Sequence, residues 1–233
     1  MKKIQIICLA ALAAALFGSC HDDSGTYASQ LFTNSEKSSA IKSCLTCSLD
    51  TAVAHLCTPD GFSEYKDGLY RLDFSGNRAM TDTLALHSYG YLSDSLVYHA
   101  NRLAESCGSV VRSAFSDAIS GLTLYDYDAL INGGGTAVTD YFAERETPAL
   151  REALKSQVSI RMSLFQVDDF WSEMVSQYYG ITHQTVSFDV QGYIIDKMTD
   201  GILEEMRCEE VLIRTDSTHR MHADSIVGRI FTK

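Results

Sequence analysis

The chain has 233 residues, of which 45% are hydrophobic, 21% are charged and only 2 are proline. This composition excludes a disordered or collagen-like chain and is typical of a compact globule, long enough to bury a large core in one domain. The formal net charge of −11 at pH 7 excludes nucleic acid as an expected partner, because an acidic protein is repelled by phosphate backbones.

The first twenty residues resemble a bacterial lipoprotein signal. Two lysines precede an apolar run from Ile4 to Phe17, and small residues lead into Cys20. We expect residues 1–19 to be removed as a signal peptide and Cys20 to be lipidated. This predicts a protein attached to the membrane through its N-terminal lipid, in the bacterial cell envelope, on the periplasmic face or the cell surface of the outer membrane. An ordinary cleaved signal and an uncleaved helix are the alternatives, although the run is short for a membrane span.

The segment after Cys20 is polar and poor in large apolar side chains. Such a composition predicts a flexible tether over residues 20–37, followed by a single helical domain over residues 38–233. Asp22 and Asp23 resemble the acidic export tag of some bacterial surface lipoproteins. Incidental acids in a solvated spacer are the alternative interpretation.

Apolar residues recur at helical spacing from about Ser38 to Cys57 and predict the first helix of the domain. A second stripe of small residues includes Cys44 and Cys47, so neighbouring helices are expected to cover this helix on two sides. We interpret both cysteines as packing residues. A local disulfide and metal or redox chemistry are the alternatives, but the motif lies inside a helix and no second CxxC completes a zinc site.

Residues 63–86 lose the helical period, which predicts a long loop or a short hairpin around Ser75 and Gly76. The helical pattern resumes near Tyr91 and is expected to break at Gly108. No alternation of strands and helices follows, so the predicted fold class is all-α, a multi-helix bundle.

The remaining helices are predicted from their start signals. We expect starts at a Thr123 and Asp126 capping box, near Thr136, at Thr147 with Pro148 in the first turn, around Trp171, and at Asp189. A last segment is expected to return apolar residues to the core, namely Ile226, Val227, Ile230 and Phe231.

Three consecutive glycines in "INGGGTAVTDYF" raise the question of a phosphate-binding loop. A Walker loop needs a lysine and a hydroxyl residue directly after its last glycine, and a dinucleotide fingerprint needs a preceding strand. Neither is present. We interpret residues 132–135 as the end of one helix joined to the start of the next, with anion binding by the amides near Thr136 as the alternative.

Three segments carry a resemblance to a known family: "FSDAISGLTLYDYDAL", "LINGGGTAVTDYF" and "DGILEEMRCEEVLIR". They are similar to the bacterial domain of unknown function 4197 family, and the resemblance covers roughly residues 38–233. It departs from the family pattern at residues 66–86 and around 215–225. The resemblance implies a helical envelope protein, commonly exported or lipidated, and it implies no activity. The positions that carry it most specifically are Asn132, Gly133, Ala137, Thr139, Tyr141, Phe142, Asp200, Gly201, Glu209, Glu210 and Arg214.

The candidate site lies at the end of the last long helix. Glu205 and Glu209 fall near its apolar side, so both are expected to be partly buried and to need partners. Arg214 and Arg220 are the available cations. These four residues predict either a buried ion-pair network between the last two helices or a site for a ligand or acid–base chemistry.

Two other groups of polar residues have spacings that allow a metal site. Asp196, Asp200 and Glu204 recur every four residues and are interpreted as a solvated acidic face rather than a metal stripe. His219 and His222 lack the further ligands of a tetrahedral set and are interpreted as surface histidines.

We therefore predict no catalytic residue, no metal and no cofactor. The leading hypothesis is a lipid-anchored envelope protein with a binding or structural role and an unspecified protein or small-ligand partner. The alternative is an enzyme or small-ligand-binding protein with a site between helices near Glu209, Arg214 and Arg220.

Overall fold

The computed structural model describes residues 32–231. The predicted signal peptide, Cys20 and most of the predicted tether therefore lie outside the described residues. Within the described part of the chain there are eleven α-helices, one 3-10 turn and no strand, so the all-α prediction is confirmed. The elements in chain order are α2 (Asn34–Leu56), α3 (Tyr65–Gly68), η1 (Ser75–Asn77), α4 (Arg78–Leu86), α5 (Gly90–Glu105), α6 (Gly108–Gly121), α7 (Tyr127–Asn132), α8 (Ala137–Leu164), α9 (Val167–Thr182), α10 (Val190–Thr215), α11 (Ser217–His222) and α12 (Ser225–Ile230).

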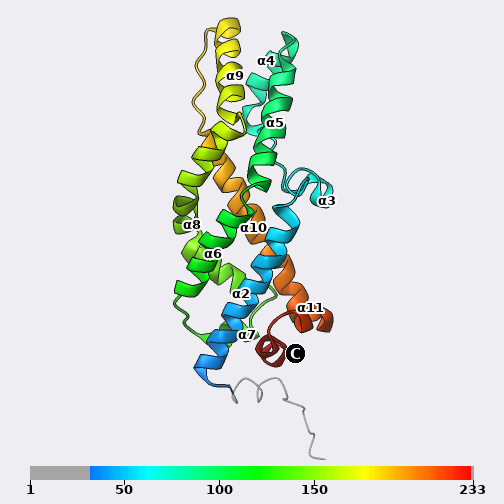
Figure 1. Cartoon of the computed structure of the whole chain (residues 1–233), viewed down its shortest axis with the longest axis vertical. Coiled ribbons are helices and arrows are strands. Elements are labelled where there is room, and N and C mark those ends of the chain that lie inside the picture. Colours follow the sequence, from blue (N-terminus) through cyan, green and yellow to red (C-terminus); the bar gives the residue numbers. More distant parts are fainter. Residues whose placement is uncertain (1–31, 232–233) are drawn as a thin grey trace, which may run out of the picture.

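Figure 1 shows an elongated bundle. The helices α4, α5 and α9 form one end, and α7, α11 and α12 form the other, where α2 begins. The long helices α2, α8 and α10 run between the two ends, and α10 packs most extensively on α2 and α8.

The core follows the predicted apolar stripes. Leu45 and Leu49 of α2 and Ile202 of α10 are completely buried. Each such side chain contributes about 1.5 to 3 kcal/mol through removal of apolar surface from water. A Cβ added to Gly201 would lie 3.2 Å from the Phe62 ring, so the glycine lets α10 approach the turn after α2 closely.

The first helix begins earlier than its apolar stripe. Thr33 accepts a hydrogen bond from the Glu36 amide, and Glu36 accepts one from the Thr33 amide, which is a complete capping box. Residues 34–37, predicted as tether, thus belong to α2. Lys37 is buried and pairs with Asp128 of α7 at 2.7 Å.

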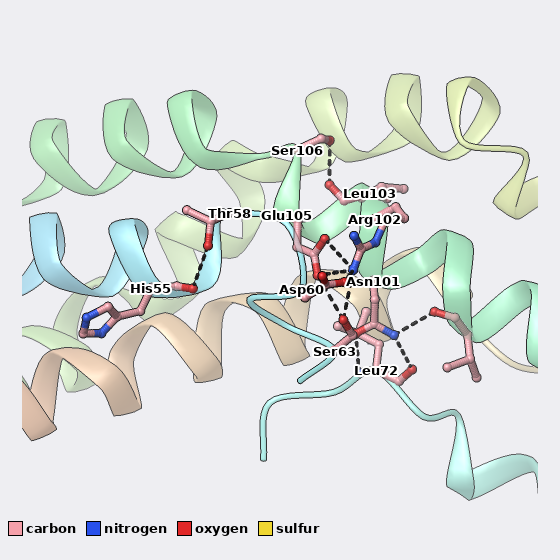
Figure 2. A network of polar contacts seen from close by, with 11 residues as sticks. His55, Thr58, Asp60, Ser63, Leu72, Asn101, Arg102, Leu103, Glu105 and Ser106 are labelled. Carbon is pink, nitrogen blue, oxygen red and sulfur yellow. Dashed lines mark hydrogen bonds and ion pairs between the residues drawn. The ribbon is translucent and has the colours of Figure 1, made fainter. Parts of the chain in front are cut away.

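Of the loop and the hairpin predicted as alternatives for residues 63–86, the structure has the loop, which contains α3 and η1 and ends where the helix α4 begins at Arg78. The side-chain amide of Asn101, on α5, donates to the Leu72 carbonyl, and its oxygen accepts from the Leu72 amide, each at 3.0 Å. One buried side chain thereby supplies the two bonds that a strand partner would have supplied (Figure 2).

The turn before α3 is fixed by a neighbouring side chain of α5. Arg102 donates to Asp60 at 2.6 Å, to Ser63 at 2.9 Å and to the buried Glu105 at 3.0 Å (Figure 2). This network holds the turn against α5 and so positions the start of α3.

Two predicted helix starts need correction. The helix α7 begins at Tyr127 with Asp126 as its cap, so Thr123 is not the start. The helix α8 continues through Pro148 instead of starting again at Thr147, whose hydroxyl donates to the Ala143 carbonyl at 2.6 Å. Proline costs α8 one backbone hydrogen bond, and packing on both sides of it keeps the helix continuous.

The starts predicted at Thr136 and Asp189 and the break at Gly108 are confirmed. The last segment packs as predicted, with Val227 completely buried.

Candidate functional site

The glycines of residues 133–135 lie directly before the start of α8. The first turn of this helix binds an anion, which is the carboxylate of Glu210 from the same chain. A Cβ at Gly133 would meet the Ala129 carbonyl at 2.5 Å, so only glycine fits this join between α7 and α8. The amides of Val138 and Thr139, in the first turn of α8, donate to the two carboxylate oxygens of Glu210 at 3.0 and 2.7 Å.

Glu210 is completely buried and is also paired with Arg214, one turn further along α10. The Arg214 Nε and Nη2 atoms donate to the same Glu210 oxygen at 2.9 and 2.7 Å. The guanidinium also donates to the Ile131 and Leu130 carbonyls and stacks 4.8 Å from the centre of the Phe231 ring. This group ties α10, α7, α8 and the C-terminal segment together, and its donors are directed at groups of the protein.

The expected pairing of Arg214 and Arg220 with Glu205 and Glu209 is corrected by these contacts. Arg220 Nη1 donates to the Ile213 and Arg214 carbonyls at 3.2 and 2.8 Å, where a cation is favoured by the C-terminal end of α10. Glu210 is not among the site residues predicted from the sequence, although its i, i+4 spacing to Arg214 favours an ion pair.

Glu205 lies in a different environment, on the side of α10 that faces α2 and α3. Its side chain is 4% exposed and accepts four hydrogen bonds. The donors are His55 Nδ1 at 2.8 Å, the Tyr65 hydroxyl at 2.8 Å, Lys66 Nζ at 2.5 Å and the Tyr70 hydroxyl at 2.9 Å.

Burial of the Glu205 carboxyl raises its pKa, but the hydrogen bonds outweigh burial, that from Lys66 most strongly, and lower the pKa to about 2. The carboxylate in turn stabilises the protonated form of its donors. Burial and then the hydrogen bond to Glu205 raise the pKa of Tyr65 to about 12. At neutral pH Glu205 is therefore a fixed negative charge, with Lys66 as its cation.

A cavity of about 340 Å³ opens beside these groups, between α2, α3, α10 and α11. We call it the Glu205 cavity; its lining includes Thr51, His55, Lys66, Glu205, Glu209 and His219.

Glu209 is the second buried carboxylate of this cavity. Its side chain is 6% exposed, and Oε1 lies 2.8 Å from Nδ1 of His219. That hydrogen bond raises the pKa of His219. His219, interpreted from the sequence as a surface histidine, thus joins α11 to α10. The structure brings Glu205 and Glu209 to one cavity and directs the side chains of Arg214 and Arg220 to other groups.

The cysteines of the first helix lie as packing residues. Cys44 is buried and Cys47 is half-buried, and both are free. Burial raises the pKa of the Cys44 thiol, and burial followed by the charge of Glu209 raises that of Cys47. Raised thiol pKa values disfavour the thiolate that redox or metal chemistry requires.

The acidic stripe of α10 forms salt bridges at the protein surface. Asp196 and Asp200 pair with Arg151 of α8 at 2.8 and 3.0 Å, and Glu204 pairs with Arg207 at 3.2 Å. No group of three or more histidine, cysteine or acidic residues suited to a metal ion occurs within residues 32–231.

The fold and these sites define an all-helical protein in which α10 carries a closed ion-pair centre at Glu210 and lines the Glu205 cavity. The chain matches the family described as "Protein of unknown function (DUF4197)" over residues 31–232, and it belongs to that family. No curated protein and no solved structure matches it.

Proposed function

We propose that this protein is a lipid-anchored protein of the bacterial cell envelope that binds a small polar ligand in the Glu205 cavity. The signal-like residues 1–19 and Cys20 support the anchor. In the described part of the chain, no helix has the length and apolar character needed to cross a membrane.

The observation that carries the binding role is the pair of buried carboxylates, Glu205 and Glu209, one helical turn apart on the wall of an open cavity. Each carboxylate removed from water costs several kcal/mol, which pairing recovers only in part. Apolar residues would join α3 to α10 at lower cost. Charged groups that are retained around a cavity therefore favour recognition of a polar ligand.

The alternative site built on Glu209, Arg214 and Arg220 receives no such support. Both arginines donate to groups of the protein, and neither of them lines the Glu205 cavity. We therefore favour binding over catalysis.

The anchor is tested by replacing the cysteine that carries it. We expect Cys20→Ala to shift the protein from the membrane fraction to the soluble fraction and to abolish labelling by radioactive palmitate. Cys8→Ala, within the same predicted signal, is the control and should behave as wild type. Membrane attachment of the Cys20→Ala variant would contradict the proposed anchor.

Ligand binding in the Glu205 cavity is tested by a substitution that fills the cavity with a larger side chain. Thr51 lines the cavity from α2, whereas Thr46 is exposed on the same helix. Native mass spectrometry of protein isolated from its own cells should show a bound small molecule in wild type and Thr46→Phe and lose it in Thr51→Phe. Identical spectra for the two variants would contradict binding in this cavity.

A further inference from the structure

The two carboxylates of the Glu205 cavity differ in the number of hydrogen bonds that they accept from the protein. Glu205 accepts four hydrogen bonds, so both of its oxygens are occupied. Glu209 Oε1 is bonded to His219, but no described residue donates a hydrogen bond to Glu209 Oε2. Glu209 Oε2 is not one of the fully buried polar atoms that lack a partner, so it is open to the cavity, where a donor from outside the described residues, water or a ligand, can reach it.

The charged groups around the cavity indicate whether a ligand that donates to Glu209 Oε2 is positively or negatively charged. Lys66 bonds to Glu205 at 2.5 Å, and the guanidinium groups of Arg214 and Arg220 donate elsewhere. Among residues 32–231, Glu209 is paired only with His219, which is neutral once the pH exceeds its pKa. Above that pH the fixed charges of Glu205, Glu209 and Lys66 leave the cavity with an excess of one negative charge.

The wall next to Glu209 is suited to the carbon atoms that accompany an amine. Cys47, Cys208 and Leu212 add two thiol side chains and one apolar side chain to this wall. An anionic ligand would instead meet carboxylates at this wall, with Lys66 already engaged. The combination favours a small organic cation.

We propose that the ligand of the Glu205 cavity carries an ammonium group and that Glu209 Oε2 is the atom that binds it. This inference rests on the proposed binding function of the cavity. Glu205, Lys66 and the two tyrosines then act as a rigid frame that fixes α3 and α10 around the ligand.

The test uses three probes of equal chain length on the full-length, detergent-solubilised protein: butylammonium, butyrate and butanol. Saturation-transfer NMR at pH 8.5 measures their binding, so that histidine charge contributes little. We expect butylammonium to bind at least tenfold more tightly than butyrate or butanol, the factor expected from one charge-assisted hydrogen bond.

A matched pair of variants tests whether the Glu209 carboxylate binds the ammonium group. Glu209→Gln keeps the shape of the side chain and should weaken butylammonium binding at least tenfold, whereas Glu204→Gln, exposed on the same helix, should leave it unchanged. The comparison of probes on wild-type protein needs no variant, so it decides the ligand class even where Glu209→Gln unfolds the protein.

Three results would overturn this inference: equal binding of butyrate or butanol, equal loss in Glu204→Gln, or no binding of any probe. If the uncharged or anionic probe binds and Thr51→Phe abolishes that binding, the cavity is a ligand site and only the ammonium assignment fails. The native mass spectra of Thr46→Phe and Thr51→Phe judge the binding function separately from the probes.

Discussion

Glu209 and Glu210 are neighbours in the sequence of α10, yet their carboxylates lie in different environments. Successive helical residues point about 100° apart, so one side chain faces the cavity and the other faces the junction of α7 and α8. Glu210 is saturated by two backbone amides and an arginine. Glu209 has one oxygen bonded to a histidine and one to which no residue in the described part of the chain donates. The same residue type thus acts as a structural anchor where every bond is internal and as a candidate binding group where one is left open.

The largest effect on stability is expected when the buried ion pair of Glu210 and Arg214 is broken. Arg214→Ala leaves the Glu210 carboxylate in the core without its cation and should lower the free energy of unfolding by about 3 to 5 kcal/mol. The matched control is Arg207→Ala on the same helix, where partly exposed pairs with Asp140 and Glu204 should cost about 1 kcal/mol or less. Urea denaturation measures both. Equal midpoints would show that the Glu210 centre is not structural.

A smaller effect, with a defined pH range, is expected at Glu205. Its pKa in the folded protein is about 2, below the ordinary value of 4.5, so its stabilisation is complete above pH 4.5 and is lost as the pH falls towards 2. This contribution is at most about 3 kcal/mol. Glu205→Gln should remove it at pH 7 and flatten the stability curve between pH 4.5 and 2. A variant with the wild-type acid dependence would contradict this account.

The smallest effect is expected at the open carboxylate. The pKa of His219 is raised by Glu209, so its contribution to stability is complete below the ordinary pKa of 6.5 and is lost as the pH rises through the raised value. Because His219 is more than one third exposed, His219→Ala should cost less than about 1 kcal/mol at pH 6 and almost nothing at pH 9. Thermal melts at the two pH values measure this, and a larger loss at pH 9 would contradict it.

The sequence predicted those features that depend on spacing along one helix. The apolar stripe of α10 placed Glu205 and Glu209 towards the interior, and caps such as Asp189 marked helix starts. It did not predict partners that come from distant backbone or from segments without periodicity. The amides that bind Glu210 are about 70 residues away, and Tyr65 and Lys66 lie where the helical pattern is lost.

The same limit explains why the sequence left both a loop and a hairpin open for residues 63–86. Residues around Leu72 lack a helical period, which on sequence grounds allows a strand. The hydrogen bonds of the Leu72 amide and carbonyl are made by the side chain of Asn101, which lies on a helix. No local sequence pattern predicts such a contact.

The packing of α2 against α10 also constrains how the chain is made. The bond from His55 to Glu205 spans 150 residues, and α2 and α10 share the most extensive interface among the described helices. During synthesis α2 is made well before α10, so the part of α2 that packs on α10 stays uncovered until residues 190–215 follow. A chain that ends before α10 therefore exposes apolar surface of α2, and we expect it to aggregate more readily than the complete chain.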